Sequence, residues 1–198
     1  DGMDSTSYVT VLREYLAASS SHYESKDWLA RNFVYFRFPQ AINPSEKDLS
    51  SFRRLIATAR QADVRLAVVS TLIPQPMLPF GWFDHRHEDL TAEIDIWATP
   101  ARYQHPATLS QLQASGKRTW LTPDRPPYSG SLAIEAPLTH ARSLPWQAFL
   151  QGHEAVWIQQ TTSWPSSLIE QGVIEPNSPT DAWLVYPGKL FGLDEPVP

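Results

Sequence analysis

The chain of 198 residues lacks several features that would place it in a familiar functional class. It has no cysteine, which excludes disulfide bonds and thiolate chemistry. It has no run approaching the roughly 20 apolar residues that span a membrane, and no signal-like apolar segment at its start. Its net charge is -5 and its basic residues form no stripe, whereas nucleic-acid binding depends on phosphate neutralisation. We therefore expect no membrane span and no nucleic-acid partner.

Sequence motifs for common catalytic and cofactor sites are also missing. There is no P-loop, no dinucleotide fingerprint and no Gly-x-Ser-x-Gly elbow. The segment 84–89, Asp-His-Arg-His-Glu-Asp, contains metal-ligand residue types. His85 and His87 have no third ligand at a standard spacing, so a solvated charged loop is the favoured interpretation. We expect neither a cofactor nor a metal.

Proline and tryptophan are plentiful, with 18 and 8 residues respectively. Proline favours ordered loops, and tryptophan supplies either core volume or flat faces for stacking. With 42% hydrophobic and 19% charged residues, the composition is that of a folded globular protein. The length predicts one domain over residues 1–198.

The pattern of apolar residues alternates between strand-like and helix-like segments. The predicted strands are 32–38, 65–71, 93–97, 117–122, 153–159 and 182–186. The predicted helices are 8–20, 45–59, 106–115 and 133–151. Ser45 is placed to cap the second helix, Pro145 predicts a kink or break in the last, and Gly116 and Gly152 are placed as helix stops. Residues 72–90 are expected to be irregular. This alternation predicts an α/β fold with a mainly parallel sheet.

Several segments match one known family in the same order. They are Trp120, Pro126-Pro127-Tyr128, residues 140–149, Gly152, Val156-Trp157 and Trp164. Residues 28–35, Asp95-Ile-Trp97 and the segment 183–188, Trp-Leu-Val-Tyr-Pro-Gly, agree with flanking parts of the family. On these residues the chain resembles glycoside hydrolase family 123 and the related domain of unknown function 4091.

This resemblance implies a barrel of eight βα units. Such a barrel needs eight strands and typically about 250 residues, more than this chain provides. We therefore expect the C-terminal part of a (β/α)8 TIM-like barrel, with its early strands and terminal helix outside this chain or in another one. An open α/β sheet, such as a doubly wound one, requires no missing part and is the alternative.

The resemblance also implies hydrolysis of glycans that contain N-acetylgalactosamine. The family uses an adjacent Asp-Glu pair ahead of a proline, at the end of the strand that matches residues 32–38, because glycoside cleavage needs a proton donor and a second stabilising group. Here Arg37 and Phe38 precede Pro39, and neither side chain can act as a general acid. Asp194-Glu195-Pro196 has the literal motif but follows the last predicted strand. We expect a domain that is non-catalytic by the family mechanism.

Three other carboxylates are candidates if the protein is an active glycosidase: Asp95, Asp124 and Glu135. Carboxylates at the carboxyl ends of barrel strands are where such enzymes place their catalysts. The favoured interpretation of each is structural. Asp95 would anchor hydrogen bonds, Asp124 would stabilise a turn, and Glu135 would lie near a helix start.

The remaining basis for sugar recognition is aromatic. Flat rings cover the apolar C–H faces of sugars while polar neighbours bind hydroxyls. The predicted carbohydrate-binding residues are Trp97, Trp120, Tyr128, Trp157, Trp164 and Gln159. Trp120 and Trp157 lie within strands and can instead fill a barrel interior, whereas Tyr128 and Trp164 lie in loops.

Three functional hypotheses follow. The leading one is a glycoside-hydrolase-like domain that binds carbohydrate or serves as a structural module of a larger extracellular or envelope protein. Its partners would be a glycan and the rest of its own polypeptide, or another chain that completes the barrel. The second is an active glycosidase resembling N-acetylhexosaminidases. The third is a scaffold without a site, because a fold alone does not establish activity.

Overall fold

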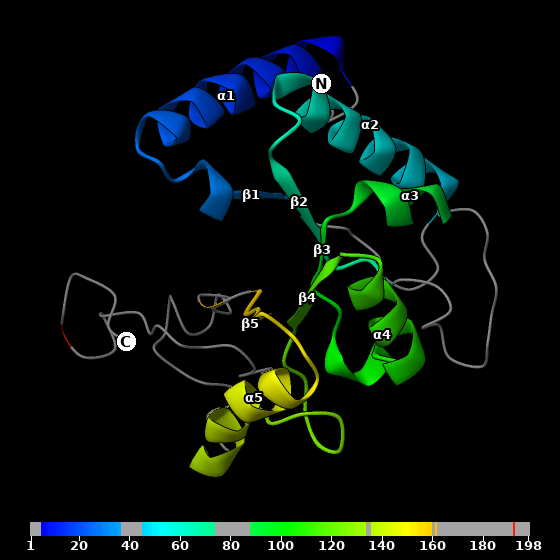
Figure 1. The fold of residues 1–198 in the computed structure, drawn as a ribbon, viewed down its shortest axis with the longest axis vertical. Coiled ribbons are helices and arrows are strands. Elements are labelled where there is room, and N and C mark those ends of the chain that lie inside the picture. Colours follow the sequence, from blue (N-terminus) through cyan, green and yellow to red (C-terminus); the bar gives the residue numbers. More distant parts are fainter. Residues whose placement is uncertain are drawn as a thin grey trace. The chain divides into compact units, whose positions relative to one another are not determined.

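The computed structural model describes residues 5–36, 45–73, 88–133, 136–159, 161 and 192, and the structural statements below concern these residues. They form an α/β fold in which helices flank one five-stranded sheet (Figure 1). The helices are α1 (Thr6–Ser25), α2 (Glu46–Ala62), α3 (Glu88–Glu93), α4 (Pro106–Ala114) and α5 (Leu138–Leu150), with short 3-10 helices η1 (Leu29–Arg31) and η4 (Ala101–Tyr103). The strands are β1 (Phe33–Tyr35), β2 (Ala67–Ser70), β3 (Ile96–Trp97), β4 (Arg118–Leu121) and β5 (Ala155–Val156).

All neighbouring strands of the sheet are parallel. Their order is β1-β2-β3-β4-β5, the same as their order in the chain. A doubly wound sheet reverses its strand order at a switch point, and the described sheet has no such reversal. The predicted α/β class with parallel strands is confirmed, and the sequential order is that of a partial TIM-like barrel or of an open sheet wound in one direction. The sixth predicted strand, 182–186, lies outside the described residues.

The chain divides into two compact units, which are described separately. The first comprises Asp1–Thr99 and Tyr103–Thr119, and the second comprises Pro100–Arg102 and Trp120–Pro198. The prediction of one domain stays a prediction.

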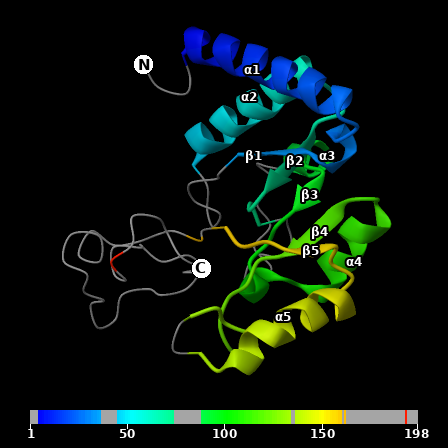
Figure 2. The same ribbon diagram turned by 90° about the vertical axis from the view of Figure 1, so that its left-hand side faces the viewer.

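In the first unit, α1 and α2 lie side by side (Figure 2). Leu16 of α1 packs with Ala59 of α2 and with Leu66 just before β2. This unit also contains a larger apolar core, formed by α2, α3, α4 and β2 together with Trp97. Its buried members include Leu49, Phe52, Ile56, Val68, Leu90, Leu109 and Leu112.

The start of α2 follows from local chemistry. The Ser45 side chain accepts a hydrogen bond from the Asp48 amide at 3.1 Å, and the Asp48 carboxylate accepts one from the Ser45 amide at 3.3 Å. This reciprocal pair is a capping box, which satisfies two backbone donors that the helix itself cannot use. The predicted cap at Ser45 is confirmed.

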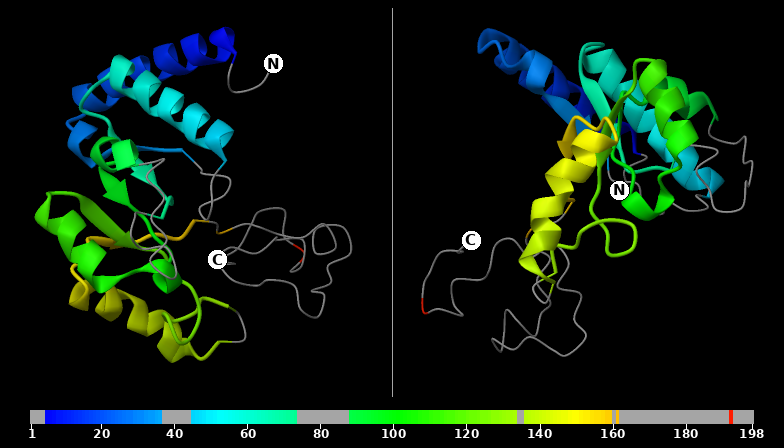
Figure 3. Two further views of the ribbon diagram at one scale, coloured as in Figure 1. Left: turned by 90° about the vertical axis from the view of Figure 1, so that its right-hand side faces the viewer. Right: turned by 60° about the horizontal axis from the view of Figure 1, so that its bottom comes forward.

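In the second unit, α5 returns the chain to β5 (Figure 3). Leu144 and Ala148 of α5 pack with Leu121 of β4 and with Ala101, while Val156 of β5 lies against this cluster. After α5 the chain reverses at Gly152, which has a positive φ of 71°. Gly116 ends α4 in the same way, with φ 80°, so both predicted glycine stops are confirmed.

Several predicted boundaries were wrong: α1 continues to Ser25 and does not end at residue 20, and β5 contains only Ala155–Val156 of the predicted 153–159. Residues 93–97 do not form one strand, because α3 continues to Glu93 and β3 contains only Ile96 and Trp97. Since α3 starts at Glu88, residues 88–90 are not irregular. The last helix starts at Leu138 and not at residue 133, because a residue that precedes proline, here Ala136 before Pro137, is driven out of the helical region.

Pro145 does not break α5, which is continuous from Leu138 to Leu150. The proline removes one backbone donor, the partner of the Ala141 carbonyl. Both residues are on the exposed side of the helix, where water can replace the lost donor, while Leu144 and Ala148 hold the buried side. In the described part of the chain, no helix has the length and apolarity that crossing a membrane requires.

Candidate functional site

The carboxyl end of β4 carries a turn, residues 123–131, that we call the β4 turn. Its first fixed point is Asp124. Arg102, from η4, donates to both carboxylate oxygens of Asp124, from Nε and from Nη2, at 2.5 Å each. This two-point geometry suits the planar guanidinium and fixes both side chains. The neighbouring backbone continues the parallel pairing, because the Ala101 amide donates to the Thr122 carbonyl at 3.1 Å.

Asp124 is ionised at neutral pH. Its side chain is only 8% exposed, and this burial by itself raises the pKa of the carboxyl. The hydrogen bonds and charge of Arg102 outweigh that effect, and the pKa of Asp124 lies below its ordinary value. A carboxylate held in this way is a poor proton donor, so its arrangement favours the structural interpretation of Asp124.

The remainder of the β4 turn is held by short-range contacts and by α5. The Asp124 amide donates to Ser129 Oγ at 2.7 Å, and Ser129 Oγ donates to the Gly130 carbonyl at 2.8 Å. Gln147 of α5 donates from Nε2 to the Tyr128 carbonyl at 2.8 Å. Gly130 approaches α5 so closely that a Cβ there would lie 2.2 Å from the His140 carbonyl oxygen. The turn is therefore attached to the helix as well as to the strand.

Tyr128 presents the accessible ring of this turn. Tyr128 is 50% exposed, and the guanidinium carbon of Arg102 lies 6.0 Å from the centroid of its ring. This distance is the outer range of a cation–π contact. Tyr128 thus combines an exposed aromatic face with a neighbouring cation whose own position is fixed by Asp124.

Trp120 and Trp157 form a ring pair between β4 and the end of β5. Their ring centroids are 5.4 Å apart and their planes are inclined by 32°. The Trp157 amide donates to the Leu121 carbonyl at 2.7 Å, which brings the two rings to the same end of the sheet. Trp120 is buried and Trp157 is partly buried. This burial favours the interior-filling role that the sequence left open for both.

Trp97 and Asp95 belong to the first unit. Trp97 is 1% exposed and packs within the larger apolar core. Asp95 precedes β3, at the amino end of the sheet, where its Oδ2 accepts from Arg60 Nη2 and from the Val68 amide at 2.7 Å each. In barrel enzymes the catalysts lie at the opposite, carboxyl ends of the strands. The contacts of Asp95 are those of a hydrogen-bond anchor.

The other predicted site residues give less information. Gln159 is exposed after β5. Glu135, Trp164, Arg37, Phe38, His85, His87 and the segment 194–196 lie outside the described residues. Within the residues that the structure describes, no three histidine, aspartate or glutamate side chains gather as metal ligands would.

Arg102 is the residue that sequence reasoning missed. It lies two residues beyond Pro100, which bridges to Thr122 in the parallel sheet, and its partner is 22 positions further along the chain. The usable signal was an arginine five residues after β3 and an aspartate three residues after β4, since the carboxyl ends of neighbouring parallel strands meet at one edge of the sheet.

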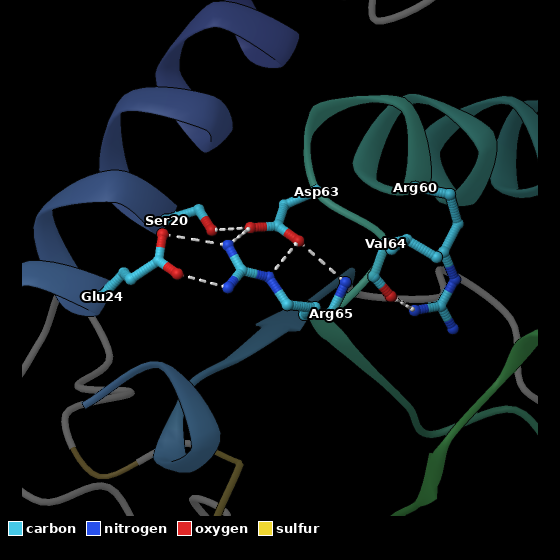
Figure 4. Close-up of polar contacts among 6 residues, drawn as sticks. All are labelled: Ser20, Glu24, Arg60, Asp63, Val64 and Arg65. Atoms are coloured by element: carbon cyan, nitrogen blue, oxygen red, sulfur yellow. Dashed lines mark hydrogen bonds and ion pairs between the residues drawn. The ribbon is translucent and has the colours of Figure 1, made fainter. Parts of the chain in front are cut away.

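A second cluster of charged residues lies between α1 and the amino end of β2, in the first unit. Arg65 donates to Glu24 Oε1 from Nη1 at 2.5 Å and to Asp63 Oδ2 from Nη2 at 2.8 Å (Figure 4). Ser20 Oγ of α1 donates to the same Asp63 carboxylate. Hydrogen bonds from Arg65 lower the pKa of both Glu24 and Asp63, and that from Ser20 further lowers the pKa of Asp63. The cluster therefore joins α1 to the segment that enters β2.

Comparison with known proteins adds no identity. No model of a known protein family matches the chain, and no curated protein sequence matches it. The resemblance to glycoside hydrolase family 123 stays a prediction.

Proposed function

We propose that the protein is a carbohydrate-binding domain that does not cleave its glycan, and that the β4 turn is part of the binding surface. The single observation that carries this proposal is the exposed ring of Tyr128 beside the fixed Arg102–Asp124 pair. An aromatic face covers the C–H groups of a pyranose, and the guanidinium that lies over this ring places a positive charge beside it. The turn needs little reordering on binding, because Ser129 and Gln147 already hold it.

The absence of catalysis is supported by the two described candidate carboxylates. A glycosidase needs one carboxyl group that is protonated when the substrate binds. Asp124 is held ionised by Arg102, and Asp95 is bound by Arg60 and a backbone amide. Both are already engaged in contacts that position the backbone. We therefore propose that neither acts as a general acid.

A glycan-array experiment tests the binding proposal. The wild-type protein is expected to bind glycans that contain N-acetylhexosamine, and Tyr128→Ala should weaken binding about tenfold or more, since the ring supplies the stacking surface. Tyr15→Ala is the matched control, because Tyr15 is an exposed tyrosine on α1, in the first unit. Equal loss in both variants, or no binding by the wild type, would contradict the proposal.

A hydrolysis assay tests the absence of catalysis. We expect no turnover of chromogenic N-acetylhexosaminides by the wild type. If turnover is found and Asp124→Asn abolishes it while the variant stays folded, Asp124 is a catalyst and the proposal is wrong.

A second function, as a module within a larger assembly, is favoured by exposed apolar side chains on two helices. On α5, Trp146 is 70% and Phe149 74% exposed, and Leu138 and Leu150 are also exposed. On α1 the exposed apolar residues are Tyr8, Val11 and Tyr15. Contiguous apolar patches on soluble proteins commonly mark interaction surfaces. We propose that further barrel elements, from the same polypeptide or from another chain, cover these faces.

The assembly proposal is tested with Trp146→Glu. Because this side chain is exposed, the variant should unfold at the same denaturant concentration as the wild type but associate less in analytical ultracentrifugation. A stability loss of more than about 1 kcal/mol would indicate that elements of the same polypeptide cover Trp146. Unchanged stability together with unchanged association would contradict the proposal.

A further inference from the structure

A cavity of about 330 Å³ opens in the first unit, at the amino ends of β2, β3 and β4. Its charged lining consists of four cations and one carboxylate: Arg60, Arg65, Lys117, Arg118 and Asp95. We call it the cationic cavity. Four of the 16 basic residues of a chain with net charge -5 surround this one space. Three carboxylates pair with two of these cations, Asp95 with Arg60 and both Glu24 and Asp63 with Arg65, so the four cations and three carboxylates carry a net charge of +1. A net positive charge at this place attracts anions, although the whole molecule is acidic.

Arg60 is held so that its charge stays at the cavity wall. Its Nη1 donates to the carbonyls of Val64 and Leu66, at 3.3 and 2.7 Å, and its Nη2 donates to the Glu93 carbonyl at 2.9 Å. These three acceptors are neutral carbonyl oxygens. Asp95 is the carboxylate that pairs with the Arg60 guanidinium. The guanidinium is thus fixed in place, which lowers the cost of ordering it around a ligand.

Arg65 forms a second fixed guanidinium. Figure 4 shows it between Glu24 and Asp63, with Arg60 nearby on the far side of Val64. Its Nε and Nη2 both donate to Asp63, and its two Nη atoms both donate to Glu24. Glu24 and Asp63 are not among the residues that line the cavity. They hold Arg65 in position while its side chain stays half exposed.

Lys117 also lines the cavity, from the loop between α4 and β4. Its ammonium group has three donors, and one of them bonds to the Ala92 carbonyl at 2.6 Å. Two donors of Lys117 are therefore available within the described contacts. Beside it, Gly116 has no heavy atom within 4 Å of the position that a Cβ would occupy, which leaves open space at this side.

We propose that the cationic cavity binds a phosphate-type oxyanion, either free or as the ester group of a small molecule such as a sugar phosphate. Tetrahedral oxyanions accept hydrogen bonds from several directions. The donors that the contacts above leave for such an anion are two on Lys117, the Nε of Arg60 and one hydrogen on Nη1 of Arg65. The volume holds the anion together with part of an attached small molecule. This site uses no residue of the β4 turn.

The test is calorimetric titration of the folded protein at low salt with three probes: inorganic phosphate, glucose 6-phosphate and glucose. Both phosphate-bearing probes should bind, and glucose should not. Lys117→Gln should weaken binding about tenfold, the usual effect of losing one charge-assisted hydrogen bond. Lys47→Gln is the matched control, since Lys47 is an exposed lysine on α2 that does not line the cavity.

Because Lys117 also bonds to the end of α3, Arg118→Gln provides a second variant, and circular dichroism checks that each variant is folded. Tighter binding of glucose 6-phosphate than of phosphate would identify an ester as the ligand, and equal binding would identify the free ion. The proposal is overturned if neither phosphate probe binds, if glucose binds as well as its phosphate, or if both cavity variants bind like Lys47→Gln.

Discussion

Asp124 illustrates how the partners of a side chain decide its chemistry. An aspartate at the carboxyl end of a parallel strand has the position of a barrel catalyst. Its two oxygens, however, accept from Arg102, and its backbone amide donates to Ser129. Those contacts keep it charged and use it to shape a turn. The position alone predicted an active-site candidate, and the arginine 22 residues earlier explains why the structural role is favoured.

Gly130 is the residue at which we expect the largest effect of a single added methyl group. In Gly130→Ala, the Cβ would lie 2.2 Å from the His140 carbonyl oxygen and 2.6 Å from Ser143 Oγ. The β4 turn would have to move away from α5, so the free energy of unfolding should fall by about 1–3 kcal/mol in urea denaturation.

Gly116→Ala is the control for this steric effect. It makes the same chemical change at a position with no neighbour within 4 Å, but with a positive φ of 80°. We expect only the conformational cost of about 1 kcal/mol there. A smaller loss for Gly130→Ala than for Gly116→Ala would contradict the close packing of the turn on α5.

At the scale of elements, α2 depends on its first turn. Ser45→Ala removes the capping box with Asp48, so the free energy of unfolding should fall by about 1 kcal/mol. Ser50→Ala, on the exposed surface of the same helix, should leave stability unchanged or raise it slightly, because alanine favours helix. Thermal denaturation of the two variants makes the comparison, and equal midpoints would count against the cap.

Local signals predicted the elements better than their ends. The cap at Ser45 and the stops at Gly116 and Gly152 were identifiable because each depends on neighbours only a few residues away. The start of α5 was missed by five residues, since the apolar pattern outweighed Pro137 in the prediction. The continuity of α5 through Pro145 could not be predicted locally, because it depends on packing of Leu144 and Ala148 against Leu121 and Ala101.

The candidate site was predictable only in part. Asp124 and Tyr128 were identified by their place after a strand, whereas Arg102 and Gln147 entered through contacts across the fold. Trp97 was predicted as a sugar ligand because tryptophan suits that role, yet it is buried in the apolar core. Residue type alone cannot distinguish a stacking surface from core volume, and burial decides between them.

At the scale of the whole molecule, the described strands are all parallel and follow one another in chain order. In the first unit the cationic cavity lies where strands begin, and in the second unit the β4 turn follows the carboxyl end of β4. In barrel proteins the carboxyl edge carries chemistry and the amino edge carries stability. The charged cluster around Arg65 is consistent with that division, because it ties α1 to the start of β2.

Acid should weaken the ion pairs of Arg65 with Glu24 and Asp63, which join α1 to the start of β2. The folded state lowers the pKa of Glu24 and Asp63, chiefly through hydrogen bonds from Arg65. A carboxyl whose pKa is lower in the folded state stabilises it above the unfolded pKa of about 4, and this contribution is lost as the pH falls further. Urea titrations should therefore show stability declining below about pH 4.

Arg65→Met isolates the contribution of this cluster. The variant should be less stable at neutral pH and should lose less stability on acidification, because Glu24 and Asp63 lose the hydrogen bonds from Arg65, which are the largest cause of their lowered pKa values. Arg13→Met, at an exposed arginine on α1, serves as the control and should keep the slope of the wild type. Identical pH slopes in the wild type and Arg65→Met would show that the cluster does not contribute.

We propose that the protein binds a glycan at the β4 turn without cleaving it, and native mass spectrometry measures both properties in one sample. The wild type is mixed with an oligosaccharide that contains N-acetylgalactosamine. We expect a complex whose added mass is that of the intact oligosaccharide, and little or no complex with Tyr128→Ala. Cleaved oligosaccharide in the wild-type sample, or complexes of equal abundance in the two samples, would contradict the account.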